Sequence, residues 1–192
     1  MFGEKKMRLR LIIILFTVIA IFVVGAAVFV WSGIYNVAAS EPHWGITHWL
    51  LGKVRERSIV AHSEGIAVLL SENPERVDMG FRNYHAMCRL CHNAPGYSRT
   101  EISKGLYPSP PDLASENVVK QLGDAELYWV IKNGIKMTGM PAFGSTHSKD
   151  ELLGMVVFVK RLPNLKPEEY AAMVKTAGLQ EEKDDDHHHG HK

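Results

Sequence analysis

A chain of 192 residues has room for one ordinary domain with appendages at its ends. Its 22 lysines and arginines are balanced by 21 aspartates and glutamates, which gives a formal net charge of +1. Because this balance provides no general attraction to nucleic acid, we expect no nucleic-acid partner.

The first predicted element is a membrane-spanning helix at residues 11–31. The run from Leu11 to Trp31 contains no charged residue, and at about 1.5 Å per residue it can cross a hydrocarbon core of roughly 30 Å. The preceding residues 1–10 include the basic side chains Lys5, Lys6, Arg8 and Arg10. Positive charge beside a first span favours the cytoplasmic side. We therefore predict a cytoplasmic basic segment, a single-pass anchor in the cell membrane, and an extracytoplasmic (periplasmic) location for the rest.

A cleaved signal peptide is the alternative interpretation of the same run. Val37-Ala38-Ala39 offers small residues at which cleavage could occur. The apolar core of a signal peptide usually spans only about 7 to 15 residues, which favours the uncleaved anchor. The chain is exported under either interpretation.

Residues 32–74 read as a linker that contains an amphipathic helix. Ile46, Trp49, Leu50 and Val54 recur at helical spacing, and charged residues lie between them. Tryptophan and basic side chains are typical of a helix at the membrane surface. A helix that packs on the following domain or on a partner subunit would show the same pattern, so both interpretations stay open.

The next predicted helix ends in the sequence Cys88-Arg89-Leu90-Cys91-His92, which contains the only two cysteines. A disulfide or a thioredoxin-like pair would leave His92 unexplained, and the β-α-β pattern of thioredoxin is missing. A zinc site would need two more ligands at finger-like spacing. In C-x-x-C-H, by contrast, each thiol adds to one vinyl group of a c-type haem and the histidine binds the iron. Gly80, earlier in this helix, either permits a close approach to an aromatic side chain such as Phe158 or lies at the surface.

Two methionines downstream are candidates for the other axial position of such an iron. Met137 and Met140 lie within residues 133–144, and Pro141 follows the second one directly. A proline restricts the residue before it to an extended conformation, which suits a ligand held on a stiff loop. Methionine and histidine together raise the reduction potential of a cytochrome c haem. We therefore predict Met140 as the ligand.

Two further helices are predicted on either side of this loop. One follows Asp124 as a candidate N-cap and stops at Gly134. The other begins at Ser148, which forms a capping-box pattern with Glu151, and continues to Pro163. Residues 164–192 read as an acidic and histidine-rich tail, which either binds a borderline metal weakly or is a solvated segment.

Together with the sequences 110–113 (PPDL) and 139–144 (GMPAFG), the C-x-x-C-H motif resembles the class I c-type cytochrome family over residues 75–163. The resemblance implies an all-α haem domain with one covalently attached haem c. It further implies haem-binding roles for Cys88, Cys91, His92, Pro111, Leu113 and Met140, with His92 and Met140 as the iron ligands. The carbonyl group of Pro111 would hold the His92 ring, with Pro110 as a possible substitute.

Five other histidines offer alternative haem ligands: His43, His48, His62, His85 and His147. His85 lies seven residues before His92 in one predicted helix and cannot reach the opposite haem face. The other four lack a stiff loop like the one around Met140, so we expect surface or hydrogen-bonded roles for all five.

These features predict a membrane-anchored mono-haem cytochrome that transfers single electrons between extracytoplasmic respiratory partners. The alternative is a haem subunit of a larger oxidase, reductase or dehydrogenase complex. No P-loop, dinucleotide fingerprint or nucleophile with an adjacent base is present, so we expect no catalysis by this chain itself.

Overall fold

The computed structural model describes residues 2–115 and 119–179, and within these ranges it contains helices and no strands. The predicted all-α class is confirmed. The chain divides into two units, residues 1–41 and residues 42–192. Helix α1 (Phe2–Ser32) belongs to the first unit, and all other helices belong to the second.

Helix α1 runs without interruption through the basic segment and the apolar segment that follows it. Its apolar side chains are exposed along most of its length. Among the described residues it is the one helix long and apolar enough to cross a membrane, judged by length and composition. A signal sequence would meet the same criteria.

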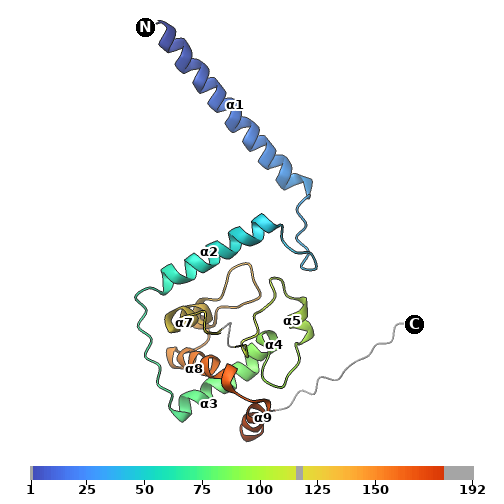
Figure 1. Ribbon diagram of the computed structural model, residues 1–192, viewed down its shortest axis with the longest axis vertical. Helices are drawn as coiled ribbons and strands as arrows, with labels where there is room; N and C mark the ends of the chain where they lie inside the picture. The colour runs from blue at the N-terminus through green and yellow to red at the C-terminus, as the bar shows by residue number, and fades with distance from the viewer. Residues whose placement is uncertain (1, 116–118, 180–192) are drawn as a thin grey trace, which may run out of the picture. The chain divides into compact units, whose positions relative to one another are not determined.

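The second unit forms a small helical domain (Figure 1). Its α-helices are α2 (Gly45–Ser63), α3 (Pro74–Asn83), α4 (Arg89–His92), α5 (Glu101–Gly105), α7 (Asp124–Asn133), α8 (Lys149–Arg161) and α9 (Pro167–Thr176). A π-helical turn, η1 (Tyr84–Cys88), joins α3 to α4, and two 3₁₀ turns, η2 (Phe143–Ser145) and η3 (Leu162–Asn164), flank α8.

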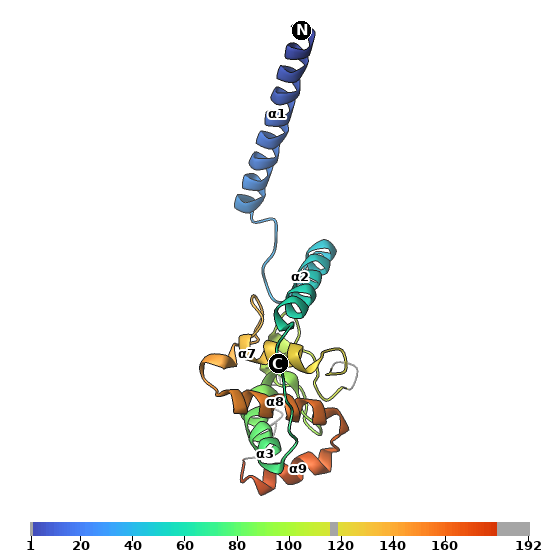
Figure 2. The same ribbon diagram turned by 90° about the vertical axis from the view of Figure 1, so that its left-hand side faces the viewer.

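The core of the domain is the crossing of α3 and α8, which lie side by side in both views (Figures 1 and 2). Gly80 of α3 meets Gly154 of α8, and a Cβ atom at Gly80 would collide with the Gly154 carbonyl group. The same Cβ atom would lie 2.9 Å from the Cβ atom of Phe158. The predicted close approach of Gly80 to Phe158 is therefore confirmed, and the surface alternative is wrong.

The ends of α7 and α8 lie where the capping residues in the sequence predicted them, except that the N-cap of α7 is one residue earlier. Ser148 caps α8, since its hydroxyl accepts from the Glu151 N–H while the Glu151 carboxylate accepts from the Ser148 N–H at 2.8 Å. Helix α7 ends at Gly134, as expected. Its N-cap is Gly123 rather than Asp124, because the Glu126 carboxylate accepts from the Gly123 N–H at 2.8 Å and Asp124 becomes the first helical residue.

Helix α9 lies within the segment for which the sequence pattern predicted no helix. Its Tyr170 and Val174 side chains are fully buried in the core. The Tyr170 ring packs edge-to-face on Phe81 at 5.5 Å and on Tyr97 at 5.6 Å. This helix therefore contributes to the core of the domain beyond the predicted boundary at residue 163. The residues of the histidine-rich tail from 180 onward lie outside the described residues.

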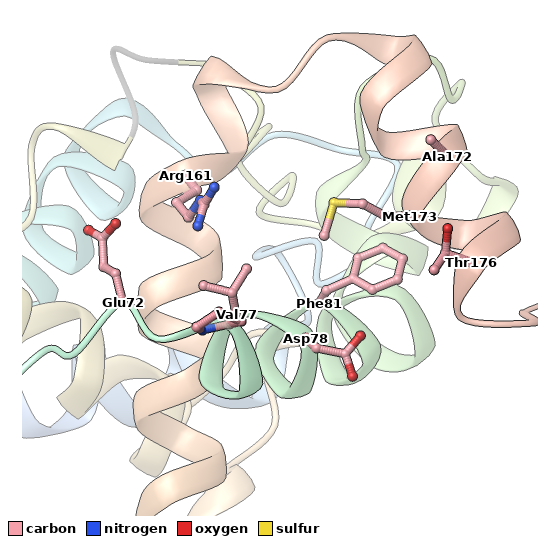
Figure 3. A pocket seen from close by; sticks show the side chains of 9 residues that line it. Glu72, Val77, Asp78, Phe81, Arg161, Ala172, Met173 and Thr176 are labelled. Atoms are coloured by element: carbon pink, nitrogen blue, oxygen red, sulfur yellow. The ribbon is translucent and has the colours of Figure 1, made fainter.

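An open pocket of about 440 Å³ lies between α3, the end of α8 and α9. Figure 3 shows Phe81 and Met173 facing one another across it. Charged side chains at its rim are Glu72, Asp78 and Arg161. The predicted haem ligands do not line this pocket, so it is separate from the candidate site.

Helix α2 packs on α7 through its C-terminal half. Ile59 and Ser63 are buried there, and the His62 ring lies 5.7 Å from the Trp129 ring. The N-terminal end of the segment is tied to the loop after α5, because the His43 N–H donates to the Tyr107 hydroxyl at 2.8 Å. Packing on the domain is thus shown for one part of the predicted amphipathic helix, whereas its apolar stripe remains exposed.

Candidate haem-binding site

The two cysteines and His92 lie where the first core helix ends. The π-helical turn η1 ends at Cys88, and the short helix α4 carries Cys91 and His92. No disulfide bond joins the two cysteines. Burial raises the pKa of the Cys88 thiol to about 12, with a smaller contribution from Cys91. At neutral pH both side chains are therefore neutral thiols on the same short helical segment.

The His92 ring is fixed by a backbone carbonyl group. Its Nδ1 atom lies 2.8 Å from the Pro111 carbonyl oxygen. Because a carbonyl oxygen can only accept, Nδ1 carries the proton and Nε2 keeps its lone pair for a metal. Burial lowers the pKa of His92, although the bond to Pro111 partly opposes this shift. The ring is thus neutral at neutral pH, as a metal ligand must be.

The neighbouring carbonyl group, that of Pro110, has a different partner. It accepts from the Arg99 guanidinium at 3.0 Å, and another nitrogen of the same group donates to the Ser109 hydroxyl at 2.8 Å. Pro111 and not Pro110 therefore faces His92. Leu113 closes the loop, since its N–H donates to the His92 carbonyl group at 3.2 Å and its half-buried side chain packs on the core.

Two hydroxyl groups hold the end of helix α4. Thr100 donates to the Leu90 carbonyl at 2.5 Å, and Ser103 donates to the Cys91 carbonyl at 2.8 Å. Carbonyl groups in the last turn of a helix have no partner within the helix, so these hydroxyls satisfy them. Thr100 also caps α5 by accepting from the Ser103 N–H at 3.1 Å. Helix α5 thereby fixes the segment that carries Cys91 and His92.

Met137 and Met140, both in the loop between α7 and η2, differ in exposure and in backbone hydrogen bonds. The Met140 carbonyl accepts from the Ile135 N–H at 3.2 Å, and the Met140 N–H donates to the Thr138 hydroxyl at 3.1 Å. Gly134, at a φ of 65°, is needed where this loop returns, because a Cβ atom there would lie 2.7 Å from the Met140 carbonyl oxygen. Met140 is half-buried, whereas Met137 has an 80% exposed side chain and a φ of 61°.

The segment from Leu106 to Pro111, which leads to the carbonyl group that holds His92, touches the loop of Met140. A Cβ atom on Gly139 would lie 2.7 Å from a methyl group of Leu106, which belongs to the segment leading to Pro111. The loop of Met140 therefore lies beside the segment whose Pro111 carbonyl group holds the His92 ring. Neutral thiols at C-x-x-C-H spacing, an imidazole with a free Nε2 and a half-buried thioether form a donor set that fits covalently bound haem.

The alternative ligands have other surroundings. His85 is buried, and its Nδ1 lies 3.0 Å from the Tyr170 hydroxyl. His62 contacts the Ser58 carbonyl at 2.8 Å, and His147 contacts the Thr146 hydroxyl at 2.9 Å. In the part of the chain that the structure describes, no three histidine, cysteine, aspartate or glutamate side chains gather into a metal site.

Sequence reasoning missed the three side chains that support the site, namely Arg99, Thr100 and Ser103. A signal existed only for Thr100, since a threonine followed by an acidic residue is typical of a helix N-cap. The roles of Arg99 and Ser103 depend on contacts between segments 10 to 12 residues apart. Helical periodicity does not report such contacts.

Comparison with known proteins finds a family model that is similar to part of the chain. Residues 75–159 match the model of cytochrome c oxidase, cbb3-type, subunit III. A solved structure of the c-type cytochrome XoxG from Methylobacterium extorquens AM1 is 23% identical, with a TM-score of 0.33. The matched part covers 53% of this chain and 66% of that one. A search of curated proteins found no significant match.

Proposed function

We propose that residues 75–159, which match the family model, form a class I c-type cytochrome domain, and that the chain is a membrane-anchored cytochrome that passes single electrons between extracytoplasmic respiratory partners. Domains of this class carry covalently bound haem c, transfer electrons and are not themselves enzymes. The observation that carries the proposal is the C-x-x-C-H helix whose His92 ring is held at 2.8 Å by the Pro111 carbonyl group.

The geometry of the site supports a ligand assignment. Cys88 and Cys91 would form the thioether bonds to haem, and His92 would bind the iron through Nε2. Met140 would supply the second iron ligand, since its loop is closed by two hydrogen bonds and its side chain is half-buried. The bound haem supplies one-electron chemistry between the ferric and ferrous states.

The protein contributes rigid ligands to this chemistry. Arg99 fixes the loop of Pro111, and Thr100 and Ser103 fix the end of the helix that carries His92. A ring whose Nδ1–H donates to a carbonyl group keeps its orientation and is a more basic ligand. Ligands that hardly move during oxidation and reduction favour fast electron transfer over binding of a substrate.

Membrane anchoring by α1 is the second part of the proposal. The helix is long and apolar enough to span a bilayer, and its N-terminal basic residues favour the cytoplasmic side. The domain would then lie on the periplasmic side. If the segment is instead cleaved as a signal, the domain is exported as a free carrier.

A haem subunit of a larger complex is the second candidate function. The matching family takes its name from a subunit of a cbb3-type oxidase. A chain with one C-x-x-C-H motif cannot relay electrons between two haems by itself, so a permanent partner would supply the next cofactor. Purification of the native protein in mild detergent would show whether another haem protein remains bound.

A pair of variants tests the axial ligand. Thioether ligation of ferric haem gives a weak charge-transfer band near the red edge of the visible spectrum. We expect Met140→Ala to abolish this band, lower the reduction potential and allow carbon monoxide to bind the ferrous haem. Met137→Ala should change none of the three, because the Met137 side chain is exposed.

Two outcomes would contradict this assignment. Loss of the band in Met137→Ala would transfer the ligand role to Met137. Ready binding of carbon monoxide by the unaltered protein at neutral pH would mean an open position at the iron, which favours a catalytic haem over a carrier.

A further inference from the structure

Helix α2 exposes an apolar stripe that its packing on the domain leaves uncovered. Ile46, Trp49, Leu50 and Val54 are between 51% and 66% exposed. At 100° per residue these four side chains fall within one sector of the helix. Several large apolar side chains exposed on one sector of a helix are typical of an interaction surface.

The opposite side of α2 faces the domain. Ile59 and Ser63 are the buried residues of α2, which contacts α7. Helical geometry puts this buried side roughly 140° or more away from Leu50. The helix is therefore held on the domain on one side, and Leu50 and Val54 point away from that side, whereas Trp49 lies at the edge of the stripe nearest to it.

Basic side chains share the exposed stripe. Lys53 lies between Trp49 and Leu50 in helical projection, and Arg57 lies between Ile46 and Leu50. Both are exposed, and the one acidic residue of the helix, Glu56, is paired with Lys53 at 2.7 Å. Aliphatic and indole side chains flanked by basic groups match the boundary between acyl chains and anionic lipid headgroups.

The chain between the two helices is short. Helix α1 ends at Ser32 and α2 begins at Gly45, and a dozen residues reach at most roughly 40 Å even when fully extended. If α1 spans the membrane, as the proposed function holds, α2 cannot leave the neighbourhood of that membrane. A lipid surface is the partner that is always within its reach.

We propose that α2 lies in the plane of the membrane surface, with Ile46, Trp49, Leu50 and Val54 inserted at the headgroup level and Lys53 and Arg57 on anionic lipid. Since Ile59 and Ser63 hold α2 on α7, the inserted helix fixes the orientation of the haem domain on the bilayer. The inference rests on the anchoring part of the proposed function.

Spin labels on the full-length holoprotein test this placement. The native cysteines are bonded to haem, so one introduced cysteine is the only free thiol. Variants Leu50→Cys and Val54→Cys place labels on the stripe, and the control Arg55→Cys places one beyond it. The protein is inserted into nanodiscs of mixed zwitterionic and anionic phospholipid. The collision rate of each spin label with oxygen, which concentrates in lipid, is compared with its collision rate with a water-soluble nickel chelate. A high ratio of oxygen to chelate collisions means that the label lies in lipid.

We expect the ratio of oxygen to chelate collisions to be at least threefold higher at positions 50 and 54 than at position 55. Replacing the anionic lipid with a neutral one should reduce this difference. An unchanged haem spectrum in all three variants shows that the domain is folded. Equal, water-like ratios at all three positions would overturn the inference and assign the stripe to a protein partner.

Extraction of the same preparations with alkaline carbonate separates this inference from the proposed function. If the protein resists extraction and the labels at 50 and 54 report water, only the surface placement of α2 is wrong. If carbonate releases the protein, the anchor itself is wrong and the inference fails with it.

Discussion

At the scale of single residues, the proximal side of the site depends on a side chain that touches no haem ligand. Arg99 binds Ser109 and the Pro110 carbonyl group, and the next carbonyl along the chain, that of Pro111, holds the His92 ring. Arg99 is a positioning residue because it sets where the Pro111 carbonyl lies. The strength of the bond to His92 Nδ1–H then sets how basic the iron ligand is.

Arg99→Lys tests this role while keeping the positive charge. Lysine is a point charge and cannot donate to both oxygens in the fixed geometry of a guanidinium. A looser Pro111 carbonyl makes His92 a less basic ligand and stabilises the ferric state less. We expect the reduction potential to rise by roughly 30 mV, about half of the 59 mV that corresponds to a tenfold change for one electron. Redox titration measures the shift.

The matched control for this variant is Arg82→Lys. Arg82 binds Asp78 and the Ala177 carbonyl group, far from the loop of Pro111 in sequence and in its contacts. The reduction potential of the Arg82→Lys variant should equal that of the unaltered protein within experimental error. If both variants shift the potential equally, Arg99 acts only as a general structural residue.

At the scale of helices, the stability of the core depends on the close crossing of α3 and α8 at Gly80 and Gly154. Gly80→Ala places a methyl group where the Gly154 carbonyl lies, and backbone cannot move aside as a flexible side chain can. We expect a loss of about 3 kcal/mol. For a chain of this size each kcal/mol corresponds to about 2 to 4 °C in Tm, so thermal unfolding followed by circular dichroism should show a fall of several degrees.

Gly52→Ala is the control, since nothing lies within 4 Å of a Cβ atom at this position. In the interior of a helix alanine is favoured over glycine by up to about 1 kcal/mol. The Tm of this variant should be unchanged or slightly raised. A small effect of Gly80→Ala, similar to that of Gly52→Ala, would mean that the two helices do not cross as closely as described.

The helices that carry strong local signals were predictable from the sequence. The capping box of Ser148, the stop at Gly134 and the C-x-x-C-H end of the first core helix all occur where they were expected. The π-helical turn at Tyr84–Cys88 was missed, because one extra residue in a turn hardly disturbs a three-and-four pattern. Helix α5 was missed because five residues are too few to show periodicity.

Helix α9 was missed for a different reason. Pro167 followed by Glu168 and Glu169 is a helix start signal that the acidic composition of the segment obscured. That Tyr170 would be buried and reach His85 could not be read from the chain order, because the contact joins positions 85 residues apart. Long-range pairing of this kind also placed Arg99 and Ser103 in the site without a sequence signal.

At the scale of the whole molecule, the described residues combine a helical domain that carries the C-x-x-C-H motif with an apolar N-terminal helix. A single C-x-x-C-H motif allows one electron to be held at a time, so a donor and an acceptor must each reach the domain in turn. Anchoring would confine that exchange to the membrane surface, and α2 would give the domain a fixed orientation there. The central claim is that this haem accepts and releases one electron with both axial positions filled.

A redox titration of the full-length protein in mild detergent, with and without carbon monoxide, tests this claim most directly. Carbon monoxide binds only ferrous haem, and where a coordination position is open it raises the apparent potential. We predict a single one-electron transition at the same potential under both conditions, because the proposed ligands His92 and Met140 would leave no position at the iron open. A transition that shifts upward under carbon monoxide would contradict the carrier function and indicate a haem open to substrate.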